Sequence, residues 1–134
     1  MESIIFQDWT VARGSGTTPY VQEAKDWLGL SSYQDVVFYL DIRAIQLSPT
    51  TGLSWNFQTS PTKDEKLFQT MTTLTVSSPP SILPVLPVIA SAGGANPPLA
   101  TWVRWQIVPN GGTTTWSTAF RVLVAANRVS PRLR

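Results

Sequence analysis

The side chains best suited to hold a ligand in this sequence are its six tryptophans and the arginine beside two of them. Trp102 and Arg104 share one face if their segment is a strand, and Trp105 takes the opposite face. An indole combines a large apolar face with a polar N–H, and β-sandwich modules hold sugars with such rings. Trp102, Arg104 and Trp116 are therefore candidate contacts for a carbohydrate. The competing interpretation places most of the tryptophans in the core of a β-sandwich.

The carboxylates give little support for catalysis. A glycosidase needs two carboxylates across a cleft, roughly 5–10 Å apart, but Asp64 and Glu65 are adjacent in a polar segment, where Asp64 is expected to cap a turn. Asp41 and Arg43 are expected to form a surface pair contributing less than ~1 kcal/mol. The chain has no histidine and no cysteine, which removes the commonest general base and the main metal ligands. We expect no enzymatic activity, no catalytic residue, no metal and no cofactor.

The composition fits one domain that is partly covered by other molecules. A chain of 134 residues is long enough for a single core. Only 13% of the residues are charged, about half the usual share, which indicates that a partner covers part of the surface. The first nine residues include Glu2 and no long apolar run, so no signal peptide is expected. No segment reaches the ~18 apolar residues of a membrane span.

Short alternating segments separated by turn residues predict an all-β fold, a single antiparallel β-sandwich resembling a jelly roll. Residues 4–11 form a first strand, with Ile5 and Val11 opposite Ile4 and Phe6. The segment 20–30 fits a short helix or a strand, and strand is favoured. The clearest strand is 36–47, with one apolar face made of Val36, Phe38, Leu40, Ile42 and Ala44.

Two strand pairings follow from the turns. The strand that begins at Leu53 is expected to form a hairpin with 36–47, across the turn 48–52. Residues 102–108 and 118–126 are expected to be neighbours because Asn110-Gly111 suits a tight turn between them.

Residues 77–98 form a long apolar segment rich in proline. It holds six of the eleven prolines, and connections longer than ~12–15 residues are commonly functional or disordered. Disordered linkers are polar, so this arm is expected to lie on a surface, either of its own domain or of a neighbouring subunit. Under the second interpretation its apolar side chains form an assembly interface: Ile82, Leu83, Val85, Leu86, Val88 and Ile89.

Charge is divided unevenly along the chain. All eight acidic residues lie within the first 65 positions, which sum to −4, and the remainder carries six basic residues and sums to +6. If the halves form separate surfaces, copies would meet positive patch to negative patch. If the halves interleave in one sandwich, the charges mix.

The C-terminal residues 128–134 form a basic tail, and Arg128, Arg132 and Arg134 are candidate contacts to the acidic half of a neighbour. Nucleic acid is not an expected partner, because such binding requires more positive charge and a clearer platform of aromatic and basic residues.

Two pairs of segments resemble small β-sandwich structural proteins of tailed bacteriophage particles. The first pair is 36–42 with 53–68, where a strand ends in Thr59-Ser60 before an acidic turn. The second is 102–107 with 118–124, an arginine-bearing strand and a closing Phe-x-Val strand. The resemblance implies a virion or phage-like particle component, such as a capsid decoration or minor capsid protein or a tail module.

The sequence therefore predicts a structural subunit that acts through protein–protein contacts with other particle subunits and with its own copies. It is expected in a virion or a cytoplasmic particle and without a membrane. The alternative is a carbohydrate-binding β-sandwich that uses the tryptophan contacts described above.

Overall fold

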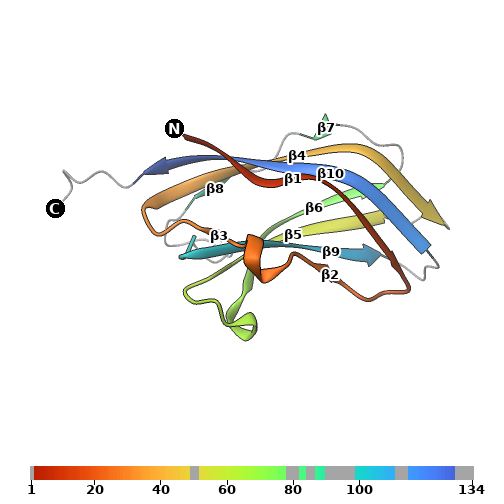
Figure 1. Cartoon of the computed structure of the whole chain (residues 1–134), viewed down its shortest axis with the longest axis horizontal. Helices are drawn as coiled ribbons and strands as arrows, with labels where there is room; N and C mark the ends of the chain where they lie inside the picture. Colours follow the sequence, from red (N-terminus) through yellow and green to blue (C-terminus); the bar gives the residue numbers. More distant parts are fainter. Residues whose placement is uncertain are drawn as a thin grey trace.

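The structure, a computed structural model, describes residues 2–48, 52–77, 82–83, 87–89, 99–110 and 115–128. These residues form two antiparallel sheets that face each other across one hydrophobic core, which confirms the predicted all-β sandwich (Figure 1). Sheet A contains, in spatial order, β1 (Glu2–Ser15), β10 (Thr115–Arg128), β4 (Tyr33–Ser48) and the short β7 (Ile82–Leu83) and β8 (Pro87–Ile89). Sheet B contains the short β2 (Tyr20–Val21) and β3 (Leu28–Gly29), then β9 (Trp102–Asn110), β5 (Gly52–Ser60) and β6 (Gln69–Ser77).

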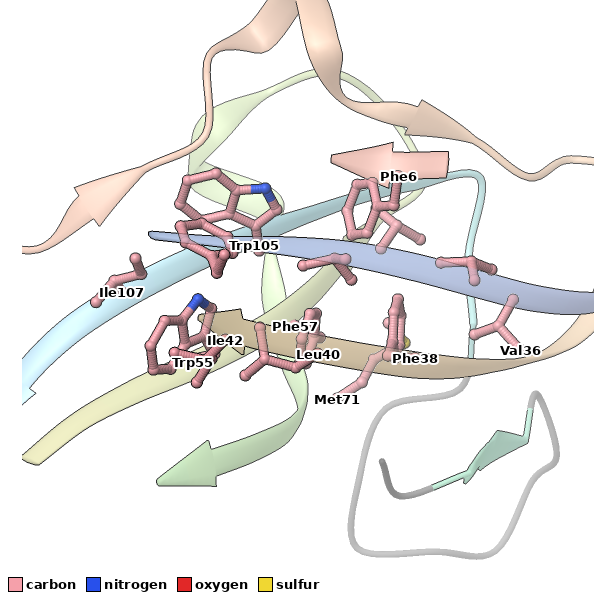
Figure 2. Packing of buried hydrophobic residues seen from close by; sticks show 14 of the residues in the cluster. Phe6, Val36, Phe38, Leu40, Ile42, Trp55, Phe57, Met71, Trp105 and Ile107 are labelled. Carbon is pink, nitrogen blue, oxygen red and sulfur yellow. The ribbon is translucent and has the colours of Figure 1, made fainter. Parts of the chain in front are cut away.

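The core is built from the alternate residues of β1, β4, β5, β9 and β10 that point between the sheets. Phe38 of β4 stacks on Phe57 of β5, with ring centroids 4.4 Å apart. Figure 2 shows how large side chains of β4, β5 and β9 fill this layer. Alternation with a period of two residues thus explains why Leu53, Trp55 and Phe57 are all buried.

The alternation of β4 changes phase at Arg43. The pairing with β10 joins Ile42 to Phe120 and Ala44 to Ala119, so Arg43 is an extra residue, a β-bulge. Val36, Phe38, Leu40 and Ile42 are buried as predicted. Ala44 is exposed, so its predicted place on the buried face is wrong; Ile45 and Leu47 pack against the core instead.

Both strand pairings predicted from the turns are wrong. β4 belongs to sheet A and β5 to sheet B, where β5 pairs with β6 and β9. Likewise β9 lies in sheet B, whereas β10 pairs with β1 and β4 in sheet A. In both cases the chain crosses from one sheet to the other between strands that are neighbours in the sequence.

The ambiguous segment 20–30 is neither one strand nor an α-helix. β2 and β3 each pair with β9, and the 3₁₀ turn η1 (Ala24–Asp26) separates them. The buried side chain of Gln22 links this segment to β1, because its Nε2 donates to the Gln7 side-chain oxygen at 3.4 Å. Its Nε2 donates to the Asp26 carbonyl at 3.2 Å, and its Oε1 accepts from the Trp105 backbone N–H at 3.3 Å.

The described parts of the proline-rich arm lie on their own domain. β7 pairs through Ile82 and Leu83 with β4, and β8 pairs with β4 through residues 87–89. Proline is tolerated there because these are edge strands. For Ile82, Leu83, Val88 and Ile89 the backbone therefore favours packing on the same domain, and their role in an interface stays a prediction. Val85 and Leu86 lie outside the described residues.

The two halves of the chain interleave, so their charges mix. Each sheet contains strands from both halves, and three ion pairs join a late arginine to an early acid: Arg121 to Asp41, Arg104 to Glu65 and Arg128 to Glu2. The fold therefore does not form separate positive and negative surfaces from the two halves of the chain.

Among the described residues, no helix has the length and apolar character to cross a membrane.

Candidate functional site

Exposed apolar side chains concentrate on the outer surface of sheet A. Six large hydrophobic residues are exposed in the described part of the chain, and four of them belong to β1 and β4: Ile5 (64% exposed), Val11 (53%), Tyr39 (46%) and Trp9 (45%). We call the outward-facing side chains of β1, β10 and β4 the sheet A face. Isolated exposed apolar residues are ordinary, but a cluster of them on one face indicates an interaction surface.

The register of sheet A places these residues in rows across three strands. One row is Ile5, Leu123 and Tyr39, and another is Val11, Ala119 and Ala44. Between the ridges of Ile5 and Tyr39 lies a shallow groove of about 400 Å³, lined mainly by apolar side chains. Its lining residues are Ser3, Ile4, Ile5, Tyr39, Leu123, Val124 and Ala125.

The row between these two holds a cluster of one indole, two guanidinium groups and one carboxylate. The Arg43 and Arg121 guanidinium carbons lie 5.3 and 4.9 Å from the centre of the Trp9 ring, within range of cation–π attraction. The Arg43 Nε donates to Asp41 Oδ1 at 2.9 Å, and the Arg121 Nε donates to Asp41 Oδ2 at 3.0 Å. Tryptophan, tyrosine and arginine are the residues that most often dominate protein interfaces.

The predicted pair of Asp41 and Arg43 is confirmed and enlarged, because Arg121 joins it from the neighbouring strand. The Asp41 side chain is 10% exposed. Its hydrogen bonds to Arg43, and then to Arg121, lower the pKa of Asp41 against the opposing effect of its burial. Because the pKa is lower in the folded chain, the cluster stabilises the fold above the unfolded value of about 3.9, and the stabilisation is lost as the pH falls through the folded value.

Replacing Asp41 by asparagine should therefore lower the free energy of unfolding by about 1.5–3 kcal/mol at pH 7, the range for hydrogen bonds to charged groups. Urea titrations from pH 7 to pH 2 should show this difference shrinking below about pH 4. Asp26→Asn, at an exposed site in η1, is the matched control and should change little at any pH. A deficit for Asp41→Asn that stays constant down to pH 2 would contradict the role of the charged cluster.

The outer surface of sheet B differs sharply, because polar side chains cover it. Asn56 donates to Gln106 at 3.3 Å and accepts from Thr73 at 2.8 Å, and Ser54 bonds to Thr75 at 2.9 Å. These cross-strand bonds satisfy the amides and hydroxyls within the sheet. The outer surface of β5 and β6 is thus polar, whereas the exposed apolar side chains of sheet A lie on β1 and β4.

The three candidate sugar contacts do not form one site. Trp116 is 3% exposed and belongs to the core, where the missing side chain of Gly14 makes room for it; a Cβ on Gly14 would lie 2.7 Å from the indole. Trp102 and Arg104 share the outer face of sheet B, as the alternation predicts, and Trp105 is buried. The Trp102 ring is covered by Lys63, whose Nζ lies 4.4 Å from the ring centre.

Arg104 is enclosed by its own chain. Its side chain is 6% exposed, and the guanidinium carbon lies 4.2 Å from the centre of the Phe68 ring and 5.3 Å from that of Trp27. Burial lowers the pKa of Arg104, and the Glu65 carboxylate, 3.7 Å away, partly opposes this. These contacts hold the η1 turn and the loop after β5 onto sheet B. Asp64 caps the turn η2 (Glu65–Leu67) in that loop, as predicted, by accepting from the Lys66 backbone N–H at 3.0 Å.

The first residue of the basic tail is also engaged within the chain. The Arg128 Nε lies 2.6 Å from Glu2 Oε2, and its guanidinium lies 5.0 Å from the Tyr33 ring centre. Hydrogen bonds from Tyr33 and Arg128 lower the pKa of Glu2. Arg128 thus ties the last strand to the first, and its contact to a neighbour stays a prediction. Arg132 and Arg134 lie outside the described residues.

The sequence interpretation did not single out the residues of the sheet A face. It assigned Ile5 and Val11 to the side of the first strand opposite Ile4 and Phe6, and the structure confirms that assignment. A strand that is apolar on both sides is the signal that could have identified this surface, since only one side can face the core.

Comparison of the chain with known protein families, curated proteins and solved structures yields no match.

Proposed function

We propose that this protein is a structural subunit whose sheet A face docks on other subunits of an assembly. The observation that carries this proposal is the contrast between the two outer surfaces of the sandwich. Ile5, Trp9, Val11 and Tyr39 gather on one of them, whereas hydrogen-bonded amides and hydroxyls of β5, β6 and β9 cover much of the other.

The energetics of the two surfaces support this division of roles. Covering apolar surface stabilises a complex by about 25 cal/mol per Å² before the costs of association are met. The polar side chains of sheet B already bond to one another, so covering them with a partner would add little. In an assembly, the sheet A face is therefore the surface that a partner covers.

The assembly we propose is a virion or phage-like particle, with the protein as a decoration or minor structural component. The order of the strands in the two sheets supports a protein of this structural class. If β2 with β3, and β7 with β8, are each counted as one interrupted strand, the sheets have the orders 1-8-3-6 and 2-7-4-5. We infer that this order is that of a jelly roll, an eight-stranded fold that viral capsid domains use. The resemblance of segments 36–42 with 53–68, and of 102–107 with 118–124, to phage structural proteins favours the same class.

Hydroxyl-radical footprinting tests this function on the purified full chain. Between about 1 μM and about 1 mM, a range that spans weak interfaces, the oxidation of Trp9 and Tyr39 should fall severalfold as subunits cover the sheet A face. Tyr20, exposed on β2 of sheet B, is the internal control and should be oxidised equally at all concentrations. Constant oxidation of Trp9 and Tyr39, or protection centred on sheet B, would contradict the proposal.

A further inference from the structure

We propose that the partner on the sheet A face is a second copy of this chain, related by a twofold axis that runs parallel to the strands between β1 and β10. This inference rests on the proposed function and specifies the partner. A twofold contact requires a surface that is complementary to itself. The shape and the charge of the sheet A face both meet that requirement.

The shape argument begins with Ile5 and the groove beside it. Among the residues that the structure describes, Ile5 is the most exposed large hydrophobic one, and the groove on its own face has Leu123 and Ala125 in its lining. An axis parallel to the strands keeps each row at the same height and places β1 of one copy over β10 of the other. Ile5 of each copy then enters the groove of the other at Leu123. In the row that contains Val11 and Ala119, Val11 of each copy meets the small side chain of Ala119 of the other.

The charge argument rests on the central row. Two arginines share the single carboxylate of Asp41, which leaves one local positive charge on the β10 and β4 side. Asp8, beside Trp9 on β1, is exposed; one of its oxygens accepts from the Trp9 backbone N–H at 2.8 Å, and it makes no ion pair within the described ranges. The twofold operation brings Asp8 of each copy toward Arg121 of the other. The excess positive charge of one face thus meets the negative charge of its partner.

The size of the contact sets its strength. From the row of Ser3 to the row of Ser117, the face spans nine residues of β10, or roughly 27 Å at about 3.4 Å per step. The two strands that overlap, β1 and β10, are about 10 Å wide together. Each copy would cover roughly 270 Å², about a third of the standard 800 Å² per partner. We therefore expect a weak pair in dilute solution, which the high local concentration of an assembly would favour.

Single cysteines test this geometry, because the natural chain contains none. Ser3→Cys and Ser117→Cys lie at opposite ends of the sheet A face, and Gln69→Cys, exposed at the start of β6 in sheet B, is the control. Each variant of the full chain is treated, near 1 mM, with a bismaleimide reaching about 10 Å, the usual spacing of packed sheets. Sedimentation of the unlinked variants at the same concentration gives their association.

We expect Ser3→Cys to form covalent homodimers and Ser117→Cys to do the same. The yield of each should be at least tenfold higher than the yield from Gln69→Cys. Dimers that appear only when these two variants are mixed would show that the copies run head to tail, which overturns the parallel axis and leaves the proposed function standing. If the variants still associate but do not cross-link, the inference that a second copy docks on this face is overturned. Absence of both cross-linking and association would contradict the proposed function as well.

Discussion

Lysine at both Ile5 and Tyr39 should weaken self-association at least hundredfold and leave the fold intact. Both side chains are about half exposed or more in the single chain, so a lysine at either position keeps its charge in water. In the proposed assembly the same two positions border the covered groove, where an unpaired ammonium group would lose its hydration. A hundredfold loss corresponds to about 2.8 kcal/mol, a modest value for such a penalty.

Sedimentation velocity over a concentration series measures this change. The matched control is the double variant Leu67→Lys and Gln69→Lys, which adds the same charge and removes an exposed apolar residue outside the sheet A face. Thermal unfolding of both variants should stay close to that of the wild type, because exposed substitutions usually change stability by less than about 0.5 kcal/mol. Equal loss of association in the two variants would show that net charge, rather than this face, controls assembly.

Phe120→Ala should lower the free energy of unfolding by about 3–5 kcal/mol, the range for phenylalanine truncated in a core. Phe120 is fully buried on β10 and its ring meets two tryptophans of sheet B edge to face. The centroid distances are 5.5 Å to Trp55 and 5.0 Å to Trp105. Truncation leaves a cavity where the two sheets contact each other and also removes both aromatic interactions.

Urea unfolding at neutral pH and low protein concentration measures this loss. Leu123→Ala is the matched control, since it lies on the same strand but faces outward, and it should cost about 1 kcal/mol or less. Similar losses for the two variants would contradict the assignment of the core to the inner side of β10.

Fold class and much of the core could be predicted because strand periodicity depends on local residue order. Leu53, Trp55 and Phe57 of β5 follow that rule, since all three point into the core. Ala44 departs from it because the bulge at Arg43 shifts β4 by one residue, and a bulge is decided by pairing with β10 across the sheet.

Strand pairing was harder to predict because it depends on contacts distant in the sequence. Asn110 and Gly111 suit a hairpin turn, yet Trp105 packs against Phe120 from the opposite sheet. The candidate site on the sheet A face was hard to predict for the same reason. The proline-rich arm attracted attention through composition, although its described parts pair with β4. Trp9, Arg121 and Asp41 are distant in sequence, and only the folded sheet brings them together.

The most direct test of the central claim, that the sheet A face holds subunits together, is the native mass of the purified wild-type chain by sedimentation equilibrium. We predict a mass that rises above the 14.7 kDa of one chain as the concentration approaches about 1 mM, the range expected for a small interface. The lysine variant at Ile5 and Tyr39 should stay at the mass of one chain throughout. A wild-type mass that remains at 14.7 kDa at every concentration would contradict the claim.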